Sequence, residues 1–549
     1  MSSHHISIWS RSSNKLRQSE IRLECFCLSG LSIAALVLFL VNLANLPLLD
    51  PNEATLAQVA KEIYQSTATF HWVFPTLWGE PYLAQPPLVH NLVAIAYGIA
   101  GVNEFTTMFP GALLGAVSVL LIYNIGREIF IARTPALFSA LVYLTCLPVV
   151  RYSRLATLDG PLLCFELVTI LAVLRSRRDV RWALVTGIGL SLISLTNGLF
   201  GCQILLISLL FLLWDTPRLV TSAYFWTGLI LGAIPGVVWY VAQWFHYHEF
   251  KTTEDLIKLF LAQTASTSVE LGLPVGYNLL QGLQYFLPWI MVGFTSLTVI
   301  QQNFHWGWGK LLAVWLGGYF ILGFLVIHQD SWLVLPIYPA LALAAGRQLD
   351  QICNLPSYVT YPRSWMYGFA LMALIAALAG LNWGIRNYVD FYLPFVCGSL
   401  SITFAATAIV IAQQDKQFIP LLFWGLFISF FLLFISPHWI WELKAVESVK
   451  PIAELVKQHT PPKAIIYSSM ALDRPSLDFY SDRQIVNQSI EELKQRWQEN
   501  ATVYLLVDSL ALKQLNLPQQ AIAKDAQFES LGWMLAIKNR KSILAGQLR

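Results

Sequence analysis

Charged residues are scarce in this chain. Only 12% of its 549 residues are Asp, Glu, Lys or Arg, whereas 56% are hydrophobic, and the mean hydropathy is +0.56. Soluble globular domains carry about 25% charged residues. The shortage of charge therefore excludes an ordinary soluble enzyme of this length and indicates a chain that lies mostly in the lipid bilayer, where charge is costly.

Several other features are missing. The net charge is only +3 and no basic stripe is present, which argues against a nucleic-acid partner. The seven cysteines form no CxxC pair, so we expect them to pack as small apolar residues rather than to bind metal. The histidines are scattered, and no glycine-rich loop follows a strand near the C-terminus. We therefore expect neither a metal nor a cofactor.

Long apolar runs dominate what is present. A transmembrane helix needs about 20 apolar residues, and somewhat fewer when it is buried among other helices. Thirteen runs qualify, namely 28–46, 109–126, 134–150, 160–174, 182–197, 200–214, 223–245, 285–301, 308–328, 332–346, 366–384, 391–412 and 418–437. The first resembles a signal peptide, but it is long and lacks a good cleavage site, so we interpret it as an uncleaved span.

Charge decides the status of one further, shorter apolar stretch, 87–100. If this stretch lies along the membrane surface, the basic turns at 127–133 and 175–181 fall on the same side as the basic tail at 11–22. Lys and Arg accumulate on the cytoplasmic side. The sequence therefore predicts about thirteen transmembrane helices, a cytoplasmic N-terminus, an extracytoplasmic C-terminus and an amphipathic helix at 87–100 on the outer surface.

The composition changes near residue 441. Short apolar runs of strand length alternate there with helical patterns. The expected strands are 464–467, 502–507 and 533–537, and the expected helices are 446–458 and 489–500. We thus predict a cytoplasmic tail (1–27), a transmembrane domain (28–440) whose outer loop 47–108 holds amphipathic helices, and a small extracytoplasmic α/β domain (441–549).

The first outer loop carries two carboxylates directly after the first span. Asp50 precedes Pro51 and fits the N-cap of a helix that Pro51 opens. Glu53 would then lie in the first turn, where a negative charge complements the helix dipole. The alternative for both residues is functional, because a carboxylate can bind a substrate or take a proton from an acceptor hydroxyl.

Two later segments also gather polar side chains near the predicted outer surface. Trp78 and Tyr82 precede a double proline and suit the aromatic belt of a membrane interface. Asp159 lies at the lip of a predicted span, where an unpaired carboxylate is costly, and Arg154 is a suitable partner. Either the two form a structural ion pair or they belong to a functional site.

These motifs, taken in order, resemble a known family. The matching segments are Asn52-Glu53, Gln85-Pro86-Pro87-Leu88, Gly101-Val102-Asn103-Glu104-Phe105, Phe109-Pro110, Arg154 with Asp159, Tyr277 with Leu287-Pro288-Trp289, Leu335-Pro336-Ile337-Tyr338-Pro339, and Ser476-Leu477-Asp478-Phe479-Tyr480. Their order and spacing are similar to those of glycosyltransferase family 39, which has the GT-C fold and includes 4-amino-4-deoxy-L-arabinose transferases and protein O-mannosyltransferases.

The resemblance implies a multi-pass enzyme of the plasma (inner) membrane that takes a sugar from a polyprenyl-phosphate donor. The acceptor would be a hydroxyl of a lipid, glycan or protein at the outer face, as in lipopolysaccharide modification or protein O-glycosylation. The implied base is among Glu53, Asp159 and Asp50. The implied substrate-binding residues are Asn52, Gln85, Arg154, Tyr82, Asn197 and Tyr277. We expect Glu53, Gln85, Arg154 and Asp159 to meet around the lipid-borne phosphate.

Four positions depart from the family pattern. Asn52 replaces an acid, Gln85 replaces a lysine, Asn197 stands where a lysine is frequent, and the neighbourhood of Gln329 replaces another lysine. Each neutral amide loses the charge-assisted part of a phosphate contact, about 1–2 kcal/mol. Two interpretations follow, either an active transferase or a catalytically impaired member that binds a lipid-linked saccharide.

A transporter or flippase is the lesser alternative. Transporters commonly show repeated halves and charges at mid-membrane. No internal repeat is visible in this sequence, and Glu166 is the main charged residue inside a predicted span. A carboxyl at that position is also explained by pairing within the helix bundle.

Overall fold

A computed structural model describes residues 3–45, 47–67, 69–246, 286–325, 335–356, 360–386, 391–440, 449–470, 473–499, 502–515, 522–523 and 532–538. The chain divides into two compact units. We call the first the helical unit, which comprises Met1–Leu43, Leu83–Val89 and Met108–Trp439. The second is the α/β unit, which comprises Ala44–Tyr82, His90–Thr107 and Ile440–Arg549.

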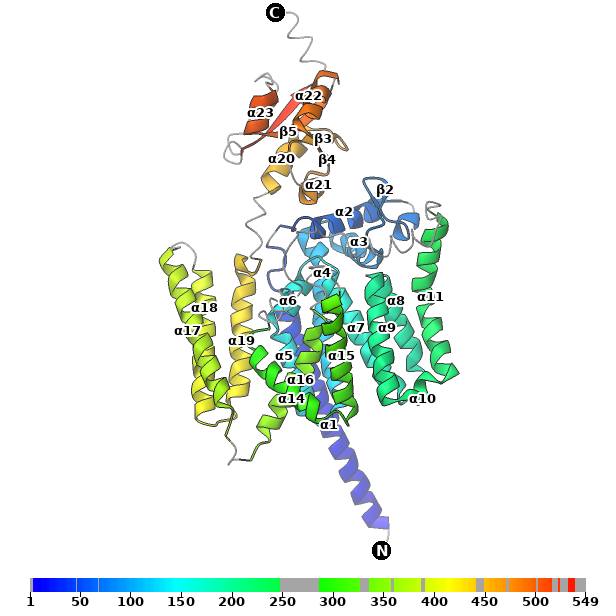
Figure 1. The fold of residues 1–549 in the computed structure, drawn as a ribbon, viewed down its shortest axis with the longest axis vertical. Coiled ribbons are helices and arrows are strands. Elements are labelled where there is room, and N and C mark those ends of the chain that lie inside the picture. Colours follow the sequence, from blue (N-terminus) through cyan, green and yellow to red (C-terminus); the bar gives the residue numbers. More distant parts are fainter. Residues whose placement is uncertain are drawn as a thin grey trace, which may run out of the picture. The chain divides into compact units, whose positions relative to one another are not determined.

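The helical unit consists of helices of very different length (Figure 1). They are α1 (Ser3–Leu40), α4 (Glu104–Ile129), α5 (Arg133–Leu144), α6 (Leu147–Arg154), α7 (Asp159–Ser176), α8 (Trp182–Ser194), α9 (Gly198–Asp215), α10 (Pro217–Val220), α11 (Ala223–His246), α14 (Ile290–Gln302), α15 (Gly307–Leu325), α16 (Ile337–Cys353), α17 (Arg363–Arg386), α18 (Tyr392–Ala412), α19 (Phe418–Ile435) and the short η3 (Pro437–Trp439).

Six of the described helices are long and apolar enough to cross a membrane. They are Ser19–Leu40 of α1, α4, α11, α17, α18 and α19, and a seventh span results if α5 and α6 count as one. The prediction of a polytopic helical membrane protein is thereby confirmed. The number thirteen stays a prediction, because several of the expected spans are helices shorter than a bilayer needs or extend outside the described residues.

A bend of 56° separates α5 from α6. The sequence predicted one straight span at 134–150. Pro148 explains the break, because a proline ring clashes with the carbonyl four residues earlier and cannot donate the helical hydrogen bond. The chain therefore leaves the helix after Leu144 and restarts at Leu147, which turns the arginine-bearing end of α6 in a new direction.

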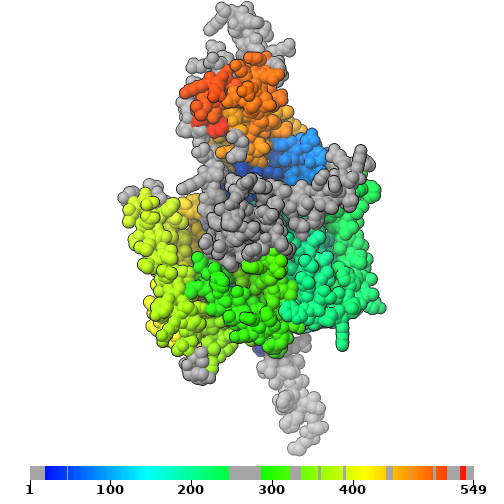
Figure 2. Space-filling view, in the orientation of Figure 1, coloured from blue at the N-terminus to red at the C-terminus, as the bar shows by residue number. Residues whose placement is uncertain are grey.

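Close helix contacts in this unit depend on glycine. A Cβ at Gly187 of α8 would lie 2.2 Å from the carbonyl oxygen of Leu229, and one at Gly232 of α11 would lie 2.3 Å from that of Leu184. Small residues of this kind let membrane helices approach backbone to backbone. In contrast, the aliphatic side chains of α17 are mostly exposed, as a lipid-facing helix requires. The α17–α18 pair is visible in yellow-green along one side of Figure 2.

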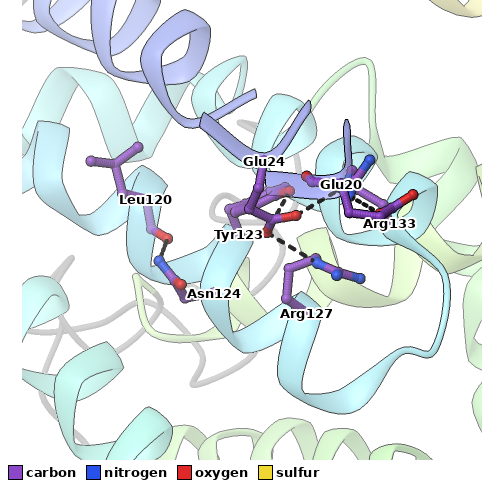
Figure 3. Close-up of polar contacts among 7 residues, drawn as sticks. All are labelled: Glu20, Glu24, Leu120, Tyr123, Asn124, Arg127 and Arg133. Carbon is purple, nitrogen blue, oxygen red and sulfur yellow. Dashed lines mark hydrogen bonds and ion pairs between the residues drawn. The ribbon is translucent and has the colours of Figure 1, made fainter. Parts of the chain in front are cut away.

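One carboxylate attaches α1 to the α4–α5 hairpin (Figure 3). Glu24 accepts hydrogen bonds from the Tyr123 hydroxyl at 3.0 Å and from Nε of Arg127 at 3.2 Å. Nε of Arg133 donates to the other oxygen at 3.0 Å, and the same guanidinium reaches Glu20 at 2.5 Å. Charges that would be costly near lipid are thus neutralised within the protein.

A second carboxyl is buried between helices. Glu166 of α7 is fully buried, and its Oε1 accepts hydrogen bonds from Nε1 of Trp315 and from the hydroxyl of Tyr319, both on α15. These contacts agree with the structural interpretation, in which this carboxyl pairs within the bundle. They join α7 to α15 and give no reason to assign a transport pathway.

The α/β unit joins segments from both ends of the chain. Its elements are α2 (Asn52–Gln65), η1 (Thr69–Trp72), β1 (Thr76–Leu77), β2 (Glu80–Pro81), most of α3 (Leu88–Ala100), α20 (Val449–His459), β3 (Ile465–Ser468), α21 (Pro475–Ser481), β4 (Gln484–Asn487), α22 (Ile490–Glu499), β5 (Val503–Asp508), α23 (Ser509–Leu515), β6 (Ile522–Ala523) and β7 (Trp533–Lys538).

A five-stranded sheet in the order β4-β3-β5-β7-β6 organises the C-terminal part of this unit. Strand β3 runs parallel to β4 and β5, whereas β7 is antiparallel to β5 and β6. Successive residues of β5 point to opposite faces. Leu505 and Leu506 are both fully buried, so helices cover both faces of the sheet. The three predicted strands overlap β3, β5 and β7.

The grouping of the outer loop differs from the domain boundaries drawn from sequence. Residues 47–108 were placed in the transmembrane domain, yet Ala44–Tyr82 and His90–Thr107 cluster with the C-terminal segment. Helix α2 packs directly on α21. The predicted helix at 87–100 is present as α3. Most of the loop is therefore a structural part of the α/β unit, whereas Leu83–Val89 belongs to the helical unit.

Candidate active site

Glu53 occupies the first turn of α2, as the sequence predicted. Its side chain is only 1% exposed, and Oε2 accepts the backbone N–H of Leu49 at 2.8 Å. Because Ala54, Leu56 and Ala57 are buried beside it, this turn of the helix lies in the protein interior. The structure thus holds a buried carboxyl at the N-terminus of α2, where the helix dipole stabilises negative charge.

Asp50 does not cap α2. The N-cap residue is Pro51, with no side-chain capping bond, so the capping interpretation was wrong. Both carboxylate oxygens of Asp50 instead bind Ser476, one accepting its backbone N–H at 2.7 Å and the other its hydroxyl at 2.5 Å. Burial raises the pKa of Asp50, although these two bonds oppose the shift. Asp50 thus joins the loop to α21.

Two further residues of α21 hold the same loop. The hydroxyl of Tyr480 accepts the N–H of Leu48 at 3.0 Å and donates to Glu104 at 3.1 Å. Asp478 accepts a bond from Nε1 of Trp78 at 3.3 Å. Residues 476, 478 and 480 therefore form one clamp, which we call the α21 clamp. The sequence motif Ser476–Tyr480 contains the residues of this clamp but does not indicate which residues they bind.

Lys61 strengthens this attachment from the α2 side. Its ammonium group forms an ion pair with Asp482 at 2.7 Å, donates to the carbonyl of Phe479 at 3.3 Å and lies 5.3 Å from the centre of the Phe479 ring. Burial tends to raise the pKa of Asp482, but the Lys61 bond and charge lower it overall. The loop that carries Glu53 is thus fixed by contacts along its whole first helix.

Arg154 is fully buried in the helical unit. Its two terminal nitrogens donate hydrogen bonds to the carbonyl oxygens of Leu38 (2.7 Å), Phe39 (3.2 Å) and Val41 (2.7 Å). Leu38 and Phe39 lie in the last turn of α1, and Val41 follows its end. The guanidinium also lies over the rings of Phe434 and Trp439. The last carbonyls of a helix lack intrahelical donors, and a cation there is favourable. These contacts make Arg154 a positioning residue between α1 and α6.

Asp159 is the first residue of α7 and is half-buried. Its Oδ2 accepts a hydrogen bond from the hydroxyl of Thr157 at 2.9 Å. The neighbouring Arg151 is buried, and its Nε donates to the carbonyl of Trp439 at 3.1 Å. The side chains of Arg151 and Arg154 thus hold the end of α6 through hydrogen bonds to backbone carbonyls. The connection from α6 to α7 ends at the carboxylate of Asp159.

The remaining predicted site residues are neutral. Asn52 is exposed at the start of α2, and Gln85 is half-buried before α3. Tyr82 packs on the small cluster of α2 and α3, with its ring 5.5 Å from that of His90. Asn197 is the N-cap residue of α9, and its buried Oδ1 has no hydrogen-bond partner among the described residues. Tyr277 lies outside the described residues.

The structure therefore brings the predicted residues together in two sets. Asp50, Asn52, Glu53 and Tyr82 belong to the α/β unit, and Gln85, Arg154, Asp159 and Asn197 belong to the helical unit. The meeting of Glu53 with Asp159 stays a prediction. The expectation that the site needs no metal also stays a prediction. Within the described residues, no three His, Cys, Asp or Glu side chains lie close enough to hold a metal ion.

Comparisons with known proteins bear on this arrangement. Residues 84–241 match the dolichyl-phosphate-mannose-protein mannosyltransferase family. An uncharacterized protein of Aquifex aeolicus is 25% identical over 58% of this chain and 63% of its own length. Undecaprenyl phosphate-alpha-4-amino-4-deoxy-L-arabinose arabinosyl transferase 2 of Pseudomonas fluorescens Pf0-1 is 24% identical over 76% of this chain and 73% of its own.

The solved structure of ArnT from Cupriavidus metallidurans bound to undecaprenyl phosphate matches 92% of this chain and 97% of its own, with a TM-score of 0.72 at 18% identity. The resemblance to glycosyltransferase family 39 is confirmed. The fold is the GT-C fold of a multi-pass membrane protein, as the motifs predicted. The chain spans 63% of the length of the Aquifex aeolicus relative, which is less than two thirds.

Proposed function

We propose that this chain is a membrane glycosyltransferase that moves a sugar from a polyprenyl-phosphate donor to a hydroxyl acceptor on the outer face of the plasma (inner) membrane. The observation that carries the proposal is the buried Glu53 carboxyl in a chain whose fold matches that of ArnT. ArnT has been solved with undecaprenyl phosphate bound, which supports a lipid-phosphate donor for this chain too.

The reaction needs one base. The acceptor hydroxyl forms a new bond to the anomeric carbon, the bond from that carbon to the phosphate oxygen breaks, and the lipid phosphate leaves with the electron pair. The hydroxyl proton passes to a carboxylate. Glu53 is our first candidate and Asp159 the second. Asp50 is the least suitable, because Ser476 already binds both of its oxygens.

The leaving phosphate needs donors. We assign this role to the amides of Gln85, Asn52 and Asn197, with Tyr82 and Tyr277 beside the substrate. Asn197 is the strongest of the amides because it stands at the N-terminus of α9, and helix N-termini favour anions. Arg154 acts indirectly. Its bonds to the end of α1 fix the position of the α6–α7 connection that carries Asp159.

The test is reconstitution of the full chain in liposomes that contain undecaprenyl-phosphate sugars and a lipid or glycan acceptor. Release of undecaprenyl phosphate is the readout, because this product is the same for every sugar. General-base catalysis contributes about 10²–10⁴-fold, so Glu53→Gln should lower the release rate by at least about 100-fold. The matched control is Glu80→Gln, an exposed carboxylate of the same loop. Unchanged release in Glu53→Gln excludes Glu53 as the base.

A second candidate function is binding of a lipid-linked saccharide without transfer. The amides at Asn52, Gln85 and Asn197, which replace charged residues of the family pattern, favour it. The same liposomes discriminate the two. A wild-type chain that retains the labelled donor through flotation but releases no undecaprenyl phosphate, with any donor and acceptor pair, supports binding alone. Acceptor-dependent release supports the transferase.

The proposed topology has its own test. We place the N-terminus in the cytoplasm and the α/β unit outside. A cysteine introduced at exposed Lys463 of the α/β unit should react with a membrane-impermeant maleimide in intact cells, whereas one introduced near the N-terminus should react only after lysis. The reverse labelling pattern contradicts the topology.

A further inference from the structure

The α/β unit contains a cavity of about 380 Å³ that none of the predicted site residues lines. Its walls come from α2, β1, α21, β4 and the segment before α21. The polar lining residues are Gln58, Asp473, Arg474, Asp478 and Asn487. Sites for small molecules commonly measure about 300–1,000 Å³, so this cavity has the size of a site for one small ligand.

Gln58 shows that the cavity is more than a packing gap. The side chain is 3% exposed, and its Nε2 donates to Glu62 at 3.4 Å. Its Oε1 is buried and has no hydrogen-bond partner in the part of the chain that the structure describes. A buried carbonyl oxygen without a donor is unfavourable. A ligand hydroxyl in the cavity would supply that donor.

Other polar residues of the lining are also arranged for hydrogen bonding. Nδ2 of Asn487 donates to Oδ1 of Asp473 at 2.8 Å, which fixes the orientation of both side chains at the end of β4. Asp478 is held by Nε1 of Trp78 and by the N–H of Ile485 at 3.0 Å. Fixed donors and acceptors in the lining of one cavity recognise a ligand by its hydrogen-bonding pattern.

The balance of charge in the lining selects the class of ligand. The carboxyls of Asp473 and Asp478 and the guanidinium of Arg474 line the space, so the lining has no excess of positive charge that would attract an anion. The apolar residues Leu77, Ile485 and Val486 complete the walls. Hydroxyl groups together with C–H faces match this mixture, and they are the surface of a neutral sugar ring.

We propose that this cavity is a binding site for a neutral saccharide unit, held by Gln58 from α2 and by Asn487 and Asp473 from the sheet. Binding there does not depend on the transfer reaction, since none of the proposed base or phosphate-binding residues lines the cavity. The protonation of one wall residue supports the proposal. Burial raises the pKa of Asp478 to about 8, helped by the nearby Asp473 and Asp50. At neutral pH this carboxyl is therefore mostly uncharged and suits a neutral ligand.

The experiment uses the full chain in lipid nanodiscs, because the sugar headgroup of a maltoside detergent would compete. Saturation-transfer difference NMR is recorded with the methyl glycosides of glucose, mannose, galactose and N-acetylglucosamine. Gln58→Met removes the orphaned oxygen at similar volume. Gln65→Met makes the same change at an exposed position of the same helix and is the matched control. Asn487→Ala tests the part of the lining that β4 contributes.

We expect a signal for at least one glycoside with the wild type and with Gln65→Met, and at least a fivefold weaker signal with Gln58→Met and Asn487→Ala. Equal signals in all four proteins, or no signal for any glycoside with the wild type, overturn the proposal. Displacement of the glycoside by an equal concentration of inorganic phosphate also overturns it, because the site would then bind anions. Circular dichroism verifies folding, and if Gln58→Met misfolds, Asn487→Ala decides.

Discussion

Replacement of Lys61 by Met should loosen α2 from α21 without unfolding the α/β unit. The ammonium group is buried, and its removal leaves the carbonyl of Phe479 without its charged donor, which costs about 1.5–3 kcal/mol. The ion pair with Asp482 adds little, because the carboxylate is 48% exposed and surface pairs contribute about 0–1 kcal/mol. The methylene groups of Met retain most of the packing. We therefore expect a loss of about 2–3 kcal/mol.

Hydrogen–deuterium exchange of the full chain in nanodiscs measures this loss directly. If α2 opens locally, 2–3 kcal/mol corresponds to about 30- to 150-fold faster exchange of its amides. Exchange in β5 and β7 should not change. Lys513→Met, at an exposed position of α23, is the control and should leave α2 as in the wild type. Exchange in α2 that is equal for both variants would refute the idea that Lys61 holds the loop.

Three further predictions concern Gln85, Asp478 and Arg154. Gln85→Lys should raise the rate of undecaprenyl phosphate release by about tenfold, because a cation restores about 1–2 kcal/mol of phosphate binding; an unchanged rate would remove Gln85 from the phosphate site. The folded state binds the Asp478 proton more tightly than the unfolded state, so the resulting stability is fully present below the unfolded pKa of about 4 and is lost as the pH rises through about 8. The protection of the α21 amides, measured as the exchange rate relative to the intrinsic rate at each pH, should therefore fall between about pH 5 and 8 in the wild type and much less in Asp478→Asn. Arg154→Met should lower the thermal midpoint of the chain, because it removes about 3 kcal/mol or more of buried hydrogen bonds. Arg154→Lys should not restore the midpoint, because one ammonium group cannot reach all three carbonyls. Full rescue by lysine would contradict the geometry.

Patterns of apolar residues predicted much of the fold. Period and composition located α3 and the strands β3, β5 and β7, because each of these elements is a short, continuous segment with a regular apolar pattern, and Pro51 indicated the start of α2. The family motifs predicted the GT-C fold. In contrast, the break between α5 and α6 was missed, although Pro148 was visible in the sequence, because apolar content alone does not distinguish a straight span from a bent one.

The contacts between distant segments were beyond sequence reasoning. Asp50 and Ser476 are 426 residues apart, and the sequence around Asp50 suggests only a helix cap before Pro51 or a functional carboxylate. Likewise, Arg154 was paired with Asp159, its neighbour in sequence, whereas its nitrogens bind the end of α1. Local patterns favour local partners. A charged side chain that satisfies backbone carbonyls of another helix leaves no periodic signal.

The α21 clamp has a consequence for the proposed reaction. Ser476, Asp478 and Tyr480 each bind a residue of the loop that carries Glu53. A carboxyl that acts as a base must be held in place relative to its substrate. The clamp supplies that rigidity from the C-terminal sheet, so changes in α21 should alter transfer even though its residues need not contact the donor.

A structure of this chain with undecaprenyl phosphate bound would test the proposed transfer site directly. We predict that the amide of Gln85 lies within hydrogen-bonding distance of a phosphate oxygen, about 3 Å, and that the carboxyls of Glu53 and Asp159 face the same cavity. A phosphate bound elsewhere, with Glu53 and Asp159 in separate cavities, would contradict the proposed transfer site.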